Sequence, residues 1–424
     1  MINLAVGHLE IDWGKNQIHQ DYSALFQGEA DVADIPYYYA GEDHYTGEED
    51  GTDVEDDIKP KPISEFKEGM SKPLFQVIDR IALLGHTYKQ CEREFAFLAA
   101  MHGFDSSRFR FEQLHDALTS VDVETISADY SEGNGENFGE FFRDEVAPRL
   151  GLKLDPIKAR GVPEAMENLS AYGILHLLAL NPSACDLPVQ WAFNEIQEYP
   201  HVRREDYVCS LGSRDRFLIV TKESSDVAIL RHALKILRPH VADFFDFVDM
   251  QEGYPFSGTG NVFRFVQGLI SISVQNDILV LFDNHAEGVA NYERCCRELK
   301  VLSNMRILKL PNLPVLKAFL TIGPNGEQKA DINGRAAAIE CYVDLDAHAR
   351  IRWTSYNTKT NTYQGELEGK TRYMLDFLGQ RVRKSSYDYS RLEVILDAII
   401  DTAIAMREIN VAKDWERAFE EVAP

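Results

Sequence analysis

The sequence predicts an α/β domain that follows an all-α domain, and three observations support this fold class. From residue 72 to about 200, apolar residues recur at helical spacing, with breaks at glycines and at Asn181-Pro182. From 214 to 312, short apolar runs alternate with helical segments, as in a parallel sheet buried on both faces. A chain of 424 residues with 45% hydrophobic residues is long enough for two or three packed domains.

Residues 1–62 are the first of four predicted parts. Residues 1 to about 27 alternate weakly between apolar and polar, which predicts a short hairpin. Residues 28–58 contain twelve acids and no Lys or Arg, so they carry half of the formal net charge of -24. Such a run is typical of a solvated insert, although a segment that mimics nucleic acid or guards a basic groove has the same composition.

Composition excludes several classes of protein. The net negative charge has the wrong sign for a protein that coats nucleic acid. The six cysteines show no C-x-x-C and no zinc-finger spacing, which predicts reduced thiols. The N-terminus lacks a basic leader, and no apolar run approaches the roughly 18 residues of a membrane span. The sequence therefore predicts a cytoplasmic protein with no membrane partner.

Residues 63–212 predict a helical domain, because six amphipathic segments follow one another with short or moderate loops. These segments are SKPLFQVIDRIALLG, HTYKQCEREFAFLAAM, RFRFEQLHDALTSV, NFGEFFRDEVAPRL, VPEAMENLSAYGILHLLAL and LPVQWAFNEIQEY.

Residues 213–315 predict a small doubly wound α/β domain. The run RFLIVT precedes a helix for which Ser224 is a plausible N-cap. The alternation continues through FFDFVDM, GNVFRFVQGLIS, DILVLFDN, AEGVANYERCCRELKVL and MRILKL. Residues 316–424 predict a C-terminal extension with a helix at GRAAAIECYVDL, a hairpin around 357–361 and a long amphipathic helix at 390–409.

Ionisable residues follow the first and third strands of the predicted parallel sheet. Ligands of such sheets bind outside the carboxyl ends of the strands, where side chains converge and helix N-termini point. Carboxylates from neighbouring strand ends can share a divalent cation that binds phosphate or activates water. The predicted ligands of Mg²⁺ or Mn²⁺ are Glu223, Asp226, Asp283 and Glu287.

The segments TKESSD and LFDNHAEG, about one βαβ unit apart, resemble the Toprim fold of topoisomerases, primases and overcoming-lysogenisation-defect nucleases. That family has a glutamate after its first strand and an Asp-x-Asp pair after its third, and these acids hold Mg²⁺ for phosphodiester chemistry. With the helical region before them and GPNGEQKADINGRAAAIECY behind, the chain from about 60 onward resembles bacterial HEPN/Toprim fusion proteins. The resemblance implies metal-dependent cleavage of RNA or single-stranded DNA in a bacterial conflict or phage-defence system.

Two positions depart from the Toprim pattern. In one register Lys222 stands at the position of the glutamate, and His285 stands at the position of the second aspartate. In one interpretation, Glu223 supplies the missing acid, Glu340 can join the ligands, and catalysis is carried out by Glu223, Asp283 and His285. In the other, the site has lost its chemistry and serves as a sensor, a partner-binding module or a nucleic-acid clamp. A cation beside a metal would cost several kcal/mol in a partly buried site.

Two Arg and His pairs in the helical domain resemble the motif of HEPN ribonucleases, in which His follows Arg by four to six residues. The pairs are Arg80 with His86 and Arg110 with His115. In that family Arg steadies a phosphate and His moves a proton, so the resemblance allows a metal-independent ribonuclease. The alternative is a surface arginine and a histidine that packs between helices.

The predicted C-terminal hairpin mixes cations with aromatic residues. Arg350, Arg352, Trp353 and Tyr356 have a composition suited to stacking on single-stranded RNA or DNA. Any half-exposed hairpin shows the same alternation. A homo-oligomer is compatible with the sequence, which does not determine the oligomeric state.

Overall fold

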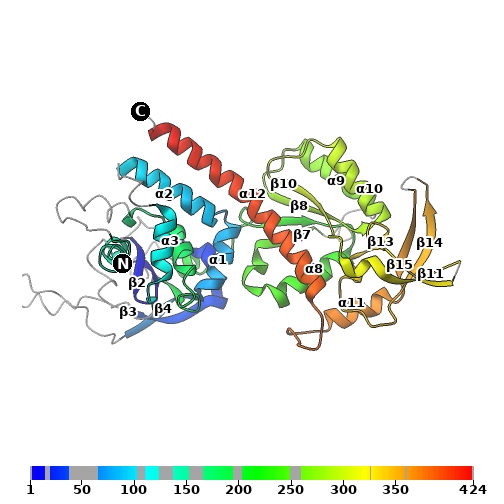
Figure 1. Ribbon diagram of the computed structural model, residues 1–424, viewed down its shortest axis with the longest axis horizontal. Helices are drawn as coiled ribbons and strands as arrows, with labels where there is room; N and C mark the ends of the chain where they lie inside the picture. Colours follow the sequence, from blue (N-terminus) through cyan, green and yellow to red (C-terminus); the bar gives the residue numbers. More distant parts are fainter. Residues whose placement is uncertain are drawn as a thin grey trace, which may run out of the picture. The chain divides into compact units, whose positions relative to one another are not determined.

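The computed structural model describes residues 2–14, 20–37, 65–102, 110–123, 137–151, 166–193, 203–248, 259–324, 326–358 and 361–422. Most of the acidic stretch at 28–58 lies outside these residues. The chain divides into unit 1, Met1–Leu211 with Arg407–Pro424, and unit 2, Gly212–Met406 (Figure 1). The hairpin at the N-terminus therefore belongs to the same unit as the helical segments, and the C-terminal hairpin belongs to the same unit as the parallel sheet.

Unit 1 contains a five-stranded antiparallel sheet in the order β2-β1-β5-β4-β3. The predicted N-terminal hairpin is confirmed, because β1 and β2 pair directly. The strands are β1 (Ile2–Val6), β2 (Leu9–Gly14), β3 (Val32–Tyr37), β4 (Glu65–Pro73) and β5 (Pro188–Ala192).

The prediction of an all-helical domain over 63–212 is wrong at β4 and β5. The segment LPVQWAF was expected to be helical, but it forms a central strand between β1 and β4. Val189 and Trp191 alternate with Gln190 and are buried on one face of the sheet. Pairing with two strands that are distant in sequence therefore overrides the local apolar spacing.

Helices pack against this sheet around one hydrophobic core. They are α1 (Leu74–Leu83), α2 (Tyr88–His102), α3 (Phe111–Thr119), α4 (Asn137–Phe141), η6 (Phe142–Val146), α6 (Ala171–Ala179) and α7 (Arg204–Tyr207), with short turns η1 (Ser23–Leu25) and η2 (Gly28–Asp31).

The long C-terminal helix α12 (Ser390–Val422) begins in unit 2 and ends in unit 1. In unit 1, Arg407 Nη1 donates to the Leu83 carbonyl at 3.1 Å, and the ring of Trp415 lies 5.5 Å from that of Phe97. Gly85 has a φ of +95°, and a Cβ there would lie 2.9 Å from Val411 and 3.0 Å from the Arg407 carbonyl oxygen. The turn after α1 thus needs glycine so that α12 can approach.

Unit 2 contains the predicted parallel sheet, in the order β10-β8-β6-β7. Successive strands are joined by α8, α9 and α10, so right-handed crossovers place α8 on one face and α9 with α10 on the other (Figure 1). The elements are β6 (Phe217–Val220), α8 (Ser224–Leu237), η8 (Pro239–Phe244), β7 (Phe245–Val248), α9 (Thr259–Ser271), β8 (Asp277–Phe282), α10 (Ala286–Glu298) and β10 (Met305–Lys309).

A second sheet in unit 2 has the order β12-β11-β14-β15 and contains the predicted hairpin. The helix predicted at GRAAAIECYVDL is wrong, because Ala336 and Ala337 pair with His285 and Asn284 in a short ladder. The elements are η9 (Pro314–Ala318), β11 (Phe319–Gly323), β12 (Gly326–Ala330), β9 (Asn284–His285), β13 (Ala336–Ala337), η10 (Ile339–Cys341), β14 (Ile351–Asn357), β15 (Thr362–Leu367) and α11 (Lys370–Leu378).

Within the described ranges, every helix is too short or too polar to cross a lipid bilayer.

Candidate functional site

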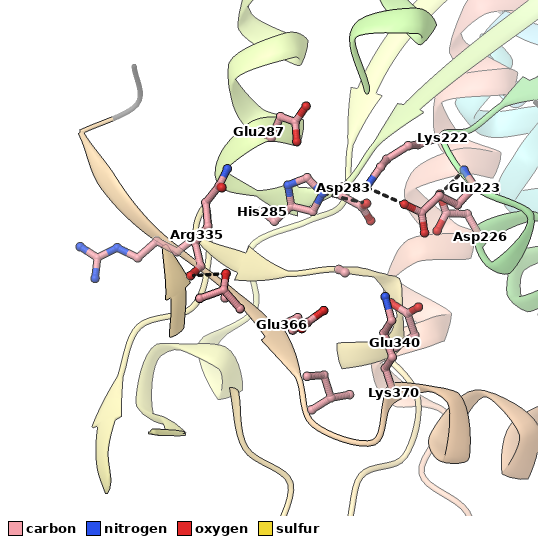
Figure 2. A pocket seen from close by; sticks show the side chains of 15 residues that line it. Lys222, Glu223, Asp226, Asp283, His285, Glu287, Arg335, Glu340, Glu366 and Lys370 are labelled. Carbon is pink, nitrogen blue, oxygen red and sulfur yellow. Dashed lines mark hydrogen bonds and ion pairs between the residues drawn. The ribbon is translucent and has the colours of Figure 1, made fainter. Parts of the chain in front are cut away.

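A pocket of about 410 Å³ opens in unit 2 at the carboxyl ends of β6 and β8 (Figure 2). Residues that follow β6 line it together with residues that follow β8, because parallel strands end at the same edge of a sheet. The structure thus brings together Lys222, Glu223, Asp226, Asp283, His285 and Glu287. Their roles in metal binding or catalysis stay predictions.

The ammonium of Lys222 lies among the carboxylates. Its Nζ is 2.7 Å from Glu223 Oε1 and 3.5 Å from His285 Nε2, and the side chain is 17% exposed. Burial alone would lower the pKa of Lys222. The hydrogen bond to Glu223 and the charges of nearby carboxylates, chiefly Asp283, outweigh burial and raise that pKa. The side chain therefore stays protonated at neutral pH.

His285 precedes α10 and caps its N-terminus. Its Nδ1 accepts a hydrogen bond from the Gly288 backbone N–H at 3.0 Å, and its Nε2 lies 3.2 Å from Asp283 Oδ2. Since Nδ1 is an acceptor, the neutral ring carries its proton on Nε2 and donates it to Asp283. Both ring nitrogens are thus engaged in contacts within the protein.

Gly288 makes this arrangement possible. A Cβ at this position would lie 2.3 Å from the Asp283 carbonyl oxygen and 3.1 Å from its Cβ. A larger residue would separate the first turn of α10 from the end of β8.

Asp226 and Glu340 are buried acids in the pocket, with exposed fractions of 7% and 5%. Burial raises the pKa of Asp226 well above its ordinary value, and the charges of Asp283, Glu340 and Glu223 add to this effect. Burial, followed by the charge of Asp283 among others, likewise raises the pKa of Glu340. Six acids and three Lys or Arg side chains line the pocket, so its acids exceed its cations.

Glu287 lies at the exposed first turn of α10, and Figure 2 shows it pointing away from Asp283. The other charged residues that line the pocket all come from the C-terminal part of unit 2, after β12. They are Arg335, Glu340, Glu366 and Lys370. Of these, sequence reasoning singled out Glu340 alone, because the others carry no local motif.

Asn284 also escaped sequence reasoning, although it separates Asp283 from His285. It is fully buried, its Nδ2 donates to Asn312 Oδ1 at 2.9 Å, and its Oδ1 accepts from the Gly334 N–H at 3.1 Å. These bonds tie the end of β8 to two loops and fix the directions of Asp283 and His285. The signal for such a residue is a polar side chain directly after a fully apolar strand.

The residues do not fit a divalent metal as they are placed. In the described ranges, no three Asp, Glu, His or Cys side chains are grouped so that they could hold a metal ion. Two contacts at this pocket explain why. The Lys222 ammonium is paired with the Glu223 carboxylate, and His285 has no free lone pair for a metal because its Nδ1 accepts the hydrogen bond from the Gly288 N–H. A metal would have to displace both side chains.

The first candidate pair of the helical region lies inside unit 1. Arg80 is fully buried, and it donates to the carbonyls of Ala24 and Phe26 at 3.0 and 2.8 Å. His86 stacks on Tyr172 at 4.4 Å between ring centroids, and burial lowers its pKa to about 4. A histidine with this pKa is a weak proton acceptor at neutral pH. These contacts favour a packing role for both residues.

The second pair lies nearer the surface. Arg110 is exposed at the residue before α3, and His115 is half-buried, with Nδ1 3.0 Å from Asp116 Oδ1. The ring of Tyr88 packs edge-on against His115. This pair stays a prediction.

The cations of the C-terminal hairpin are paired with carboxylates. Arg350 contacts Glu327 at 2.8 Å as well as Glu368, and Arg352 also pairs with Glu368. Tyr356 is 48% exposed, and its ring packs edge-on against Tyr363. Trp353, half-buried, lies beside Tyr363. The aromatic rings therefore remain exposed, as expected for stacking, whereas both arginines form ion pairs with carboxylates of the protein.

Two units, one with an antiparallel sheet and helices and one with a charged pocket at the carboxyl edge of a parallel sheet, define a mixed α/β protein. The family model described as HEPN/Toprim N-terminal domain 1 matches residues 1–215. The chain therefore belongs to the HEPN/Toprim N-terminal domain family, and the resemblance predicted from sequence is confirmed. A domain of this family suggests a nuclease-related module. No curated protein and no solved structure matches the chain.

Proposed function

We propose that the chain is a nuclease-related protein that binds RNA or single-stranded DNA at the pocket of unit 2 and does not cut it through a divalent metal ion. The observation that carries this proposal is the Lys222 ammonium, which pairs with Glu223 at 2.7 Å among the acids expected to hold metal. A role in bacterial conflict or phage defence belongs to the same proposal and rests on the resemblance to HEPN/Toprim fusion proteins.

Several groups at the pocket attract anions, although its acids outnumber its cations. The N-termini of α8 and α10 point toward it, and the ends of such helices favour anions. Lys222, Arg335 and Lys370 line it as well. The buried acids oppose a phosphodiester, so a bound strand would contact the exposed cations Arg335 and Lys370 at the rim rather than Asp226.

A second candidate function is cleavage that depends on Mg²⁺ or Mn²⁺ held by Glu223, Asp226 and Asp283. The carboxylates of Asp283, Glu340 and Glu223 favour it, because their charges add to burial in raising the pKa of Asp226 and a cation would relieve that repulsion. It requires Lys222 to leave Glu223.

Binding and cleavage assays separate these functions. Purified full-length chain is mixed with labelled RNA, single-stranded DNA and duplex DNA, with Mg²⁺, with Mn²⁺ or with EDTA. We expect binding that persists in EDTA, that weakens several-fold in Lys370→Met, and that is unchanged in Lys235→Met, an exposed lysine on α8.

Cutting that needs Mg²⁺ and is lost in Asp283→Asn would establish the second candidate instead. Asp277→Asn is the matched control, because Asp277 begins the strand that Asp283 follows. Cutting that survives EDTA but is lost in His115→Ala or His86→Ala would assign the activity to unit 1. A chain that binds no nucleic acid under any condition would overturn the proposal.

A further inference from the structure

The gap between the two acidic strand ends is filled by a side chain of the protein itself. Figure 2 shows Lys222 reaching from the end of β6 toward Asp283, with its Nζ paired with Glu223. The Lys222 side chain is 17% exposed and that of Glu223 is 35% exposed, so the contact is partly shielded from solvent. Such shielding strengthens the attraction between the ammonium and the carboxylates.

The acids around Lys222 need a cation. Asp226 and Asp283 are each 7% exposed, and Glu340 is 5% exposed. Carboxylates this close repel one another unless a positive charge lies between them. Lys222 is drawn toward Glu223, Asp283 and Asp226 together, so one ammonium serves three acids.

His285 reduces the same excess of negative charge. As a neutral ring it donates a hydrogen bond to Asp283, where an aspartate in its place would add a further negative charge. A lysine in place of a glutamate raises the formal charge by two units, the charge of one divalent ion. The two departures from the Toprim pattern therefore act in the same direction, and both lower the negative charge that a divalent ion would otherwise balance.

We infer that Lys222 is a built-in cation, which holds the carboxylates of the pocket together in the position that a divalent ion would otherwise take. This inference deepens the proposed function, on which it rests for the role of the pocket. The carboxylates around Lys222 then always have a cation among them, and the structure of the pocket does not depend on divalent ions. If the ammonium is removed, the carboxylates around it become able to bind a metal ion.

The experiment measures Mn²⁺ binding by the electron paramagnetic resonance signal of free Mn²⁺, together with thermal unfolding in Mn²⁺ or EDTA. The native chain is expected to bind no Mn²⁺ at this pocket and to unfold at the same temperature in both solutions. Lys222→Met keeps the aliphatic stem and is expected to bind one Mn²⁺ at this pocket under conditions in which the native chain binds none there. Its unfolding temperature rises with Mn²⁺.

Three further variants serve as controls. Lys222→Arg keeps the charge and Lys235→Met changes an exposed lysine on α8, so both are expected to behave as the native chain. Lys222→Met combined with Asp283→Asn is expected to lose the new Mn²⁺ site.

Two results would overturn the inference: native protein that binds Mn²⁺ and loses it in Asp283→Asn, or Lys222→Met that binds no more tightly than native protein. If Lys222→Met fails to fold, a measurement on the native chain tests the inference instead. Mn²⁺ that broadens the ring signals of His285 in nuclear magnetic resonance contradicts the inference, and unchanged signals support it. No nucleic acid is present, so these results are independent of whether the chain binds RNA or DNA.

Discussion

Acidification should destabilise unit 1 through His86. The ring of His86 stacks on Tyr172 and is half-buried, and its burial together with the neighbouring His176 lowers its pKa from 6.5 to about 4. In the unfolded chain the same ring takes up a proton near pH 6.5. The unfolded state therefore binds more protons between pH 6.5 and 4, so stability is lost as the pH falls through this window.

The depression of the His86 pKa corresponds to roughly 3 kcal/mol of stability lost by pH 4, of which about 2 kcal/mol is lost by pH 5. The assay is urea unfolding at pH 7, 6 and 5, followed by the fluorescence of Trp191, which is buried in unit 1, in a chain whose other three tryptophans are replaced by phenylalanine. His86→Phe retains an aromatic ring against Tyr172 and cannot titrate. We expect the native chain to lose about 2 kcal/mol more than this variant between pH 7 and pH 5. Parallel losses in the two proteins would refute the reasoning.

Three further predictions concern the pocket and the core. The raised pKa of Asp226 means that its contribution to stability falls as the pH rises above 3.8, so Asp226→Asn should stabilise by about 1 kcal/mol at pH 7.5 and by less at pH 4.5 in urea unfolding. Gly288→Ala should cost about 1–3 kcal/mol and shift the His285 ring signals, whereas Gly268→Ala, in open space on α9, should stabilise by about 0.5–1 kcal/mol. Equal effects at the two glycines would contradict the close approach of Gly288 to Asp283. Arg80→Met should lower stability by about 2 kcal/mol, since it leaves the buried Phe26 carbonyl and the half-buried Ala24 carbonyl without the Arg80 donor, and a shift within the error of the urea midpoint would argue against that role.

The parallel sheet was predictable because its signal is local. The runs RFLIVT and DILVLF are buried on both faces, and each is followed by polar residues and a helix. The topology of the sheet alone then places Glu223 and Asp283 at the same edge. The position of the Lys222 ammonium does not, because the sequence supplies the charge but not the direction of a flexible side chain.

The antiparallel sheet of unit 1 was not predictable by the same means. VQWA is too short to show a period, and its partners β1 and β4 lie more than a hundred residues away in the chain. The same limit hid Glu366 and Lys370, which reach the pocket through the second sheet and α11. Asn284 was hidden because its partners come from loops after β10 and β12.

The family match covers residues 1–215, whereas Arg407, Val411 and Trp415 of α12 cover the turn at Gly85 and the side of α2. A fragment cut after residue 215 would expose the apolar surface that these side chains shield and would leave the Leu83 carbonyl without the Arg407 donor. Anyone who expresses the N-terminal portion by itself should therefore supply the last helical turns as a separate peptide or through a tether.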